Sequence, residues 1–399
     1  MPHAFFPATE PEAAVFPLLE RLRPSVRDEI ERHRQHNAVV QAELRTARRS
    51  GGAVELERFY WSTQHPEPHS PWGFSARTLF CDDGAAVPRL YEFPAEPALT
   101  WLAADPGPLH HRGLPERVDV LRYIPLRRLT VRVHDAAELP PRVIAKVKRP
   151  SGLNRAAIAF LAVHRAASKR RADAPTVPQL LRLDPLRHVL YLQELPGEPL
   201  SVAVDTMDLT AAMQHLGELH RSLQELDVDS ITSHRTIGDW VQSARVAATQ
   251  VGLFVPSSAG RAGRVYAELA RTAPADRRPL FCQGDFLPGQ VLCDASGWSV
   301  IDFDDSRYAD PLSEVAAMYA ALPRELGLPP EPAEQARRAY LQAYVSRAGE
   351  PFDRARWRWF LTLCELVELG KRLMKGRVTP GETQTVLDRL SRRDDDEPS

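Results

Sequence analysis

The segment FCQGDFLPGQVLCDASGWSVIDFDD, residues 281–305, carries the most information about fold and function. Its two apolar stretches, VLC and WSVIDF, are separated by the turn sequence DASG, which predicts a β-hairpin. A hairpin of this length holds the residues before its first strand close to those that end its second strand. We therefore expect Asp285 and Gln290 to lie near Asp302.

Two carboxylates and an amide at the end of a hairpin suit phosphoryl transfer. One carboxylate can orient an acceptor hydroxyl and take its proton, while oxygen atoms of the other two side chains hold Mg²⁺ against the phosphates. The alternative is a hairpin with solvated acids, which the G-D or the D-F-D sequence alone would favour. Both sequences together, at this spacing, favour the phosphoryl-transfer interpretation.

Composition excludes several classes of protein. The 399 residues include 51 basic and 52 acidic ones, and a net charge of −1 argues against a nucleic acid or an anionic membrane as partner. The four cysteines form no C-x-x-C pair, so neither a disulfide framework nor a zinc cluster is indicated. No apolar run is long enough to span a bilayer, and the first residues lack a signal-peptide layout. We expect a cytoplasmic protein.

The order of the expected elements indicates two lobes. Residues 10–50 read as helical, 53–100 as short strands and 104–115 as a linker. Strands are then expected at 117–124, 129–133, 142–148, 177–183 and 188–195, with a helix at 154–167 before the last two; helices follow at 207–226, 237–250, 261–272, 312–321, 331–347 and 356–374. This order implies a small antiparallel-sheet lobe joined to a mostly helical lobe.

The hairpin segment resembles the catalytic and metal-binding loops of the aminoglycoside phosphotransferase-like family. That family carries H-G-D-x-x-x-x-N, then I-D-F, then G-D-P-x-x-D-x-A, where this chain has QGDFLPGQ, IDFDD and ADPLSEVA. The resemblance implies an α+β, bilobal protein-kinase-like fold with an N-terminal extension, and ATP and Mg²⁺ as cofactors. It also implies that Asp285 is the catalytic base, that Gln290 and Asp302 are metal ligands, and that Asp310 is a structural acid.

A strand lysine agrees with the order of the family's motifs. Lys146 ends the sequence VIAK and is similar to the kinase lysine that binds the nucleotide's α and β phosphates. Lys148 is the rival, because residues i and i+2 share one face of a strand. We favour Lys146 because Ile144, two residues earlier, would then give the adenine site an apolar neighbour. A solvated strand charge is the alternative for either lysine.

The sequence YLQELPGEPL, residues 191–200, resembles the family's connection between lobes. By that resemblance, the backbone around Glu194 and Leu195 would form hydrogen bonds with adenine. Read alone, the same sequence could be any buried strand that a Pro-Gly turn ends. His220 matches a histidine common in these enzymes and is expected to be structural.

Four departures from the family's pattern concern the site. Gln283 replaces the usual histidine, and Gln290 replaces asparagine, as in maltokinase-like relatives. The helix after the lysine strand has no acid between residues 154 and 169, so the usual lysine–glutamate ion pair is missing or rebuilt from elsewhere. The connection PLRR has no glycine, and Arg127 and Arg128 could contact phosphate in place of backbone amides. The alternative is two arginines on a strand turn.

The expected function is ATP-dependent transfer of the γ-phosphate to a hydroxyl of a small molecule, such as a sugar, amino sugar or aminoglycoside-like acceptor. The alternative is a pseudokinase that binds nucleotide or a protein partner without turnover. Acids that could meet a cationic amino sugar are Asp304, Asp305, Glu314, Glu365 and Glu368. The expected domains are an extension or cap over 1–105, a sheet lobe over 106–195, a helical lobe over 196–391 and a disordered acidic tail over 392–399. The sequence does not indicate an oligomeric state.

Overall fold

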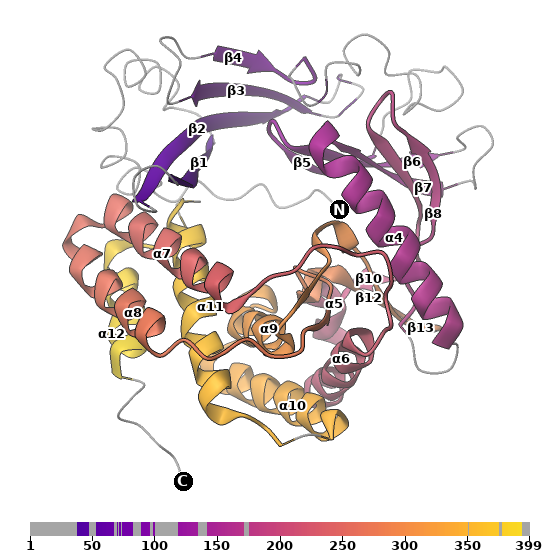
Figure 1. The fold of residues 1–399 in the computed structure, drawn as a ribbon. Coiled ribbons are helices and arrows are strands. Elements are labelled where there is room, and N and C mark those ends of the chain that lie inside the picture. The colour runs from indigo at the N-terminus through magenta and orange to yellow at the C-terminus, as the bar shows by residue number, and fades with distance from the viewer. Residues whose placement is uncertain are drawn as a thin grey trace. The chain divides into compact units, whose positions relative to one another are not determined.

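The chain divides into two compact units. A computed structural model describes residues 38–47, 53–67, 70, 72, 74–82, 89–95, 99, 119–134, 142–170, 175–349, 351–374 and 377–392 (Figure 1). One unit comprises Met1–Glu96, Gly238–Ala273 and Glu365–Ser399, and the other comprises Pro97–Ile237 and Pro274–Cys364. Among the described residues, no helix combines the length and the apolar character that crossing a bilayer requires.

The second unit begins with a five-stranded antiparallel sheet. Its strands are β5 (Asp119–Ile124), β6 (Arg128–His134), β7 (Arg142–Lys148), β8 (Leu180–Asp184) and β9 (Val189–Gln193), in the order β5-β6-β7-β9-β8. Along β6 every second side chain is buried, as the two-residue period of a strand requires. Helix α4 (Pro150–Arg170) packs against β8 and β9 through a face rich in alanine. These elements confirm the expected sheet lobe.

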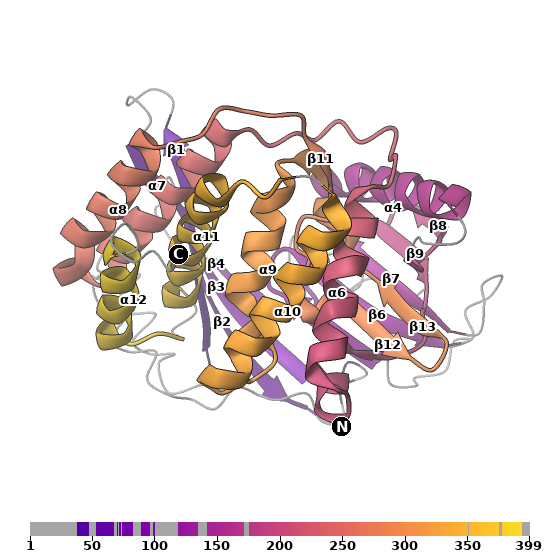
Figure 2. The ribbon, with the colours of Figure 1, turned by 90° about the horizontal axis from the view of Figure 1, so that it is seen from below.

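The rest of this unit is mainly helical. Its helices are α5 (Leu200–Ala203), α6 (Leu209–Gln224), α9 (Pro311–Glu325) and α10 (Pro330–Ala348), together with the first part of α11 (Arg354–Met374) and the short turns η3 (Val204–Thr206), η5 (Pro288–Gln290) and η6 (Phe303–Asp305). Helices α6, α9 and α10 lie side by side (Figure 2). At Gly217 a Cβ would overlap the carbonyl oxygen of Tyr340, so glycine permits the close approach of α6 to α10.

The expected hairpin lies among these helices. Strands β12 (Val291–Asp294) and β13 (Gly297–Val300) pair antiparallel, and β10 (Glu198–Pro199) extends them to a three-stranded sheet. Strands β11 (Leu280–Cys282) and β14 (Arg307–Ala309) pair on either side of the hairpin in the chain. The loop before the hairpin and the turn after it are thereby held at the same end of the hairpin.

The first unit contains a second antiparallel sheet. Its strands are β1 (Ala38–Ala47), β2 (Ala53–Pro66), β3 (Phe74–Asp82) and β4 (Arg89–Glu92), in that order. The same unit includes α7 (Ile237–Phe254), η4 (Pro256–Ser258), α8 (Ala259–Arg271), the end of α11 and α12 (Pro380–Arg392), and α8 packs against α12. The sequence had not indicated helix α12.

The structure corrects the expectation that residues 10–50 are helical. Residues 38–47 form strand β1, which pairs with β2 from Ala38↔Thr63 to Ala47↔Ala53. Adjacent β-branched residues in the sequence favour a strand, and pairing with a long neighbour outweighs apolar spacing that also fitted a helix. Residues 10–37, the linker 104–115 and the tail 393–399 lie outside the described residues, and the expected domain boundaries stay a prediction.

Candidate active site

A buried glutamine joins the loop before the hairpin to the residues that end it. The Gln283 side chain is 0% exposed. Its Nε2 donates to the carbonyl oxygens of Ile301, at 2.9 Å, and Asp302, at 2.6 Å, while its Oε1 accepts from the N–H of Asp285 at 2.7 Å. The amide thus serves as donor and acceptor at once, which places the backbone of Asp285 beside that of Asp302.

The backbone of the loop at Gly284 packs closely against the backbone at Asp305. Gly284 has φ 101°, and a Cβ there would overlap the carbonyl oxygen of Asp305. Asp302 has φ 65°, in the left-handed region that aspartate adopts more readily than most residues. The Ile301 N–H donates to the carbonyl oxygen of Gln290 at 2.9 Å. The structure therefore brings together the backbones of Asp285, Gln290 and Asp302, as the hairpin spacing predicts.

A buried carboxylate, that of Glu314, supports the same loop. Glu314, 6% exposed, accepts from the N–H of Gly284 at 2.5 Å and from that of Gln283 at 3.3 Å. Its Oε2 also lies 3.0 Å from Nε2 of His220, whose Nδ1 lies 2.6 Å from the Tyr340 hydroxyl. Burial opposes ionisation of Glu314, but the contacts with His220 and Gly284 outweigh it and lower the pKa. Glu314 positions the loop and is not available to an acceptor, which corrects its inclusion among the acceptor acids.

Three cations from the sheet surround the carboxylate of Asp304. Lys148 Nζ lies 2.6 Å from Asp304 Oδ2, and Arg128 Nη1 lies 3.3 Å from the same oxygen. Lys146 Nζ lies 3.4 Å from Asp304 Oδ1 and 2.5 Å from Asp302 Oδ1. Arg128 also approaches Asp302 Oδ2, at 3.7 Å. Asp304 is 3% exposed, so the cluster lies largely out of water.

The cluster fixes the charges of its members. Burial alone would raise the pKa of Asp304, but Lys146 and Lys148 outweigh burial and hold this pKa well below its ordinary range. Burial would lower the pKa of Lys146, but Asp304 and Asp302 together raise it. For Lys148 burial prevails and its pKa is lowered. Lys146 contacts Asp302 directly, whereas Lys148 contacts Asp304, and the choice of Lys146 over Lys148 stays a prediction.

The sequence left open whether the family's lysine–glutamate ion pair is missing or rebuilt from elsewhere. In the structure Asp304 takes the place of that glutamate. Helix α4 carries no acid, and the counter-charge to Lys146 comes from the turn η6. Helix α4 contributes an aromatic side chain instead. The Phe160 ring lies 6.0 Å from that of Phe303, edge to face, and Lys146 Nζ lies 5.3 Å from the Phe160 centroid. Sequence reasoning classed Asp304 among the acceptor acids, and its burial among three cations corrects that interpretation.

The residues expected to bind the nucleotide base lie on strand β7 and directly after its neighbour β9 in the same sheet. Ile144 is half-buried and pairs with Leu192 of β9. Glu194 and Leu195 come directly after the end of β9. The Glu194 side chain accepts from Arg132 Nε at 2.8 Å and so is held to the sheet. Leu195 is buried. The connection after β9 therefore has a fixed position beside Ile144.

Two of the remaining acceptor acids pair with arginines. The exposed Asp305 pairs with Arg155 at 3.3 Å. Glu365 is buried, belongs to the other unit and pairs with Arg389 at 3.1 Å. No group of three or more His, Cys, Asp or Glu that could hold a metal occurs among the described residues. Gln290 and Asp302 still fit Mg²⁺, since this ion is commonly held by one or two protein oxygens together with phosphates.

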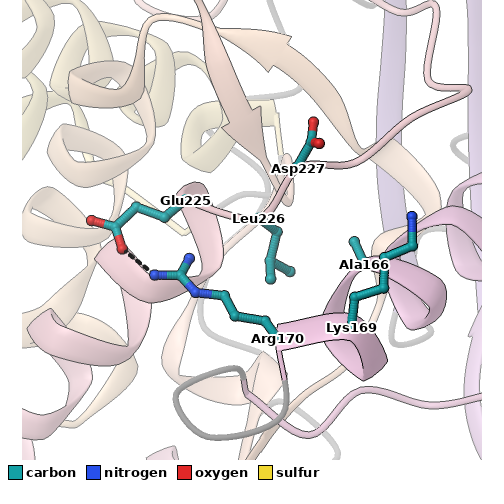
Figure 3. A pocket seen from close by; sticks show the side chains of 6 residues that line it. All are labelled: Ala166, Lys169, Arg170, Glu225, Leu226 and Asp227. Carbon is teal, nitrogen blue, oxygen red and sulfur yellow. Dashed lines mark hydrogen bonds and ion pairs between the residues drawn. The ribbon is translucent and has the colours of Figure 1, made fainter.

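A separate cavity of about 540 Å³ lies at the end of helix α4. Its lining residues are Ala166, Lys169, Arg170, Glu225, Leu226 and Asp227 (Figure 3). Arg170 Nη2 and Glu225 Oε2, 2.7 Å apart, form an ion pair across one side. None of the expected site residues lines this cavity, so it is distinct from the candidate active site.

The chain is similar to several solved structures. A thermostable mutant of aminoglycoside phosphotransferase APH(4)-Ia, in apo form, is 18% identical with a TM-score of 0.53, over 70% of this chain and 95% of that one. A ternary complex of a mutant of the same enzyme with ADP and hygromycin B has 18% identity and a TM-score of 0.51, with the same coverage. Aminoglycoside phosphotransferase APH(3'')-Id from Streptomyces rimosus is 20% identical, with a TM-score of 0.47, over 67% of this chain and 96% of that one. No curated protein sequence matches the chain significantly.

A family model matches most of the second unit. The model of the phosphotransferase enzyme family, APH, matches residues 126–360, more than half of the chain. The two APH(4)-Ia structures establish that the α+β fold is protein-kinase-like. The likeness of Gln290 to maltokinase-type relatives stays a prediction. The matched residues include the strand lysine, the glutamine-linked loop and the hairpin, and the chain belongs to the phosphotransferase enzyme family.

Proposed function

We propose that this chain transfers the γ-phosphate of ATP to a hydroxyl of a small molecule, with a sugar, amino sugar or aminoglycoside-like compound as acceptor. The observation that carries the proposal is the link from Asp285 through Gln283 to Asp302, with Lys146 on Asp302. It supports Asp285 as base, Asp302 as metal ligand and Lys146 as phosphate-binding cation, the groups that phosphoryl transfer uses. Family membership supports phosphotransfer, while ATP, Mg²⁺ and the acceptor class belong to the proposal.

The residues divide the reaction between them. Asp285 orients the acceptor hydroxyl and takes its proton as the new oxygen–phosphorus bond forms and the bond to the β-phosphate oxygen breaks, which releases ADP. Lys146 and Arg128 bind the phosphates, while Ile144 and the backbone of Glu194 and Leu195 bind adenine. Mg²⁺, held by Gln290 and Asp302, would neutralise charge on the phosphates.

The missing helix acid was the strongest argument for the alternative of a pseudokinase. Asp304 supplies that counter-charge, with Oδ1 3.4 Å from Lys146 Nζ. The base and the metal aspartate are also present in connected positions. We therefore favour the active enzyme, and the experiment below separates the two functions.

The test is ADP formation by the full chain with ATP, Mg²⁺ and a panel of sugars, amino sugars and aminoglycosides, followed by mass spectrometry of the product. Asp285→Asn should lower the rate by about 100- to 10,000-fold, because the base is lost while binding remains. Asp294→Asn is the matched control, since that half-buried acid ends β12 at the turn of the same hairpin and an asparagine keeps the oxygen that accepts from Gly297. Nucleotide binding without phosphorylation of any acceptor, unchanged by Asp285→Asn, would instead indicate a pseudokinase.

A further inference from the structure

The turn between β5 and β6 cannot bind phosphate through a row of backbone amides. Pro125 has no N–H, and the N–H of Arg127 donates to the carbonyl oxygen of Ile124 at 3.1 Å. Leu126, between them, is buried and has φ 57°. Kinases usually cover the nucleotide phosphates with a glycine-rich loop at this connection. Here another group must supply those hydrogen bonds.

A β-bulge in β5 turns an arginine to the face that bears the site. The register of β5 against β6 shifts between Val120 and Arg122, which leaves Leu121 as the extra residue. In an unbroken ladder Leu121 would pair with Thr130, and Arg122 would point to the opposite face. The bulge instead pairs Arg122 with Thr130. Re-aiming of a side chain beside an active site is a common role of such bulges.

The pairing places Arg122 in one row with the strand lysine. Thr130 pairs with Lys146 across β6 and β7, so Arg122, Thr130 and Lys146 share a face of the sheet. Lys148 and Arg128, two residues from Lys146 and Thr130, lie on this face as well. Arg122 thus shares with Lys146, Lys148 and Arg128 the face that approaches the end of the hairpin.

Arg122 differs from the other three cations in how it is used. Lys146, Lys148 and Arg128 pair with Asp302 or Asp304, whereas Arg122 is exposed and makes no ion pair with another described residue.

The charged groups that act on Arg122 belong to the candidate site. Its pKa is lowered, first by partial desolvation and then by repulsion from Arg128, against attraction from Asp302 and Asp285. A cation attracted by both aspartates, and open to solvent, lies beside the place where a phosphoryl group passes from a metal-bound nucleotide to a base-bound hydroxyl.

We propose that Arg122 binds the terminal phosphate of the nucleotide and stabilises the charge that develops on it during transfer, a role that rests on the proposed function. Its planar fork suits bidentate contact with two phosphate oxygens. Arg128 adds a second donor, because its Nε is buried without an acceptor among the described residues. The two guanidinium groups together replace the absent backbone amides.

The test compares nucleotides that differ only in the terminal phosphate. Binding of ADP and of a non-hydrolysable ATP analogue, each with Mg²⁺, is measured by calorimetry for the wild type, Arg122→Gln and Arg122→Lys. Arg122→Gln should weaken binding of the ATP analogue by at least about tenfold and leave ADP binding within about twofold, since the fork contacts the terminal phosphate alone. The kcat should fall by roughly 100-fold or more, with partial recovery in Arg122→Lys, which keeps the charge without the fork.

Arg165→Gln is the matched control, because it removes one positive charge from an exposed arginine of α4 that pairs with Asp229 at 3.8 Å. It should change neither affinity. Equal losses for ADP and the ATP analogue in Arg122→Gln, or no loss in either, would overturn the role of Arg122 while leaving ATP-dependent transfer intact. A wild type that binds neither nucleotide would overturn the proposed function and this inference together.

Discussion

Asp304→Asn tests whether the charge cluster holds the site together. The substitution keeps the size of the side chain and removes one negative charge from among Lys146, Lys148 and Arg128. Lys146 and Arg128 would then share Asp302, and Lys148 would lose its ion pair, in a part of the protein that is largely shielded from water. Breaking a buried ion pair by removing one partner leaves the other charge uncompensated, which is the costly case.

The expected loss follows from burial and from the number of partners. Removal of one partner of a buried pair typically costs about 3–5 kcal/mol, and the asparagine oxygen recovers part of it as a hydrogen-bond acceptor, so we expect about 3 kcal/mol. For a domain of about 150–250 residues, each kcal/mol lowers Tm by about 2–4 °C. The expected decrease in Tm is therefore roughly 6–12 °C.

The dependence on pH identifies the cause. The pKa of Asp304 in the folded protein lies below its ordinary value of 3.8, so the carboxylate stabilises the fold above that value and loses this contribution as pH falls toward the folded-state pKa. The difference in Tm between wild type and Asp304→Asn should therefore be full near pH 7 and shrink below about pH 4. Thermal unfolding followed by circular dichroism between pH 3 and pH 7 measures it.

The neighbouring Asp305 provides the control. Its side chain is 58% exposed and pairs with the equally exposed Arg155, so Asp305→Asn should cost less than about 1 kcal/mol. Asp304→Asn should also weaken nucleotide binding, because Lys146 loses one of its two carboxylate partners. If Asp304→Asn lowers Tm no more than Asp305→Asn does at pH 7, the cluster does not hold the site and the reasoning is refuted.

Three further predictions concern the loop before the hairpin. Gln283→Leu should destabilise the protein by several kcal/mol, because each buried group left unpaired costs about 1–3 kcal/mol. Gln283→His should retain more of the stability and more of the kcat. Urea unfolding and steady-state rates compare the two variants. Gly284→Ala should lower kcat and Tm together, because a Cβ would overlap the Asp305 carbonyl oxygen, and an unchanged kcat would contradict the close approach. Glu314→Gln should lower Tm more at pH 7 than near pH 4, since the pKa of Glu314 is lowered in the folded state; pH-dependent melting with His220→Asn as comparison checks this.

The hairpin and its aspartates could be predicted because their spacing is local. Two apolar stretches around a four-residue turn fix which backbones meet, so Asp285, Gln290 and Asp302 come together whatever the rest of the chain does. The strands of the sheet lobe were likewise evident from alternation and turn residues. Lys146 followed from its position in one such strand, with Lys148 as an open alternative.

The roles of Asp304 and Arg122 could not be predicted in the same way. An acid two residues after Asp302 has no periodic signal that separates a buried position from an exposed one. The available signal was an imbalance of charge, because three cations of the sheet face the hairpin and α4 offers no acid to pair with them. Arg122 was missed because regular alternation through 117–124 would give its place to Leu121, and a bulge is set by pairing rather than by the strand's own residues.

The origin of the counter-charge changes what can control this site. In protein kinases the strand lysine depends on an acid from a mobile helix, so movement of that helix separates active from inactive states. Here Lys146 is held by Asp302 and Asp304, which belong to one short segment, while α4 contributes Phe160 beside Lys146 and Arg155 beside Asp305. The acid that pairs with Lys146 is therefore not supplied by α4, although Phe160 of α4 packs against Phe303 in the segment that supplies it. The absence of an acid from α4 thus leaves the proposed phosphotransfer with a counter-charge for Lys146.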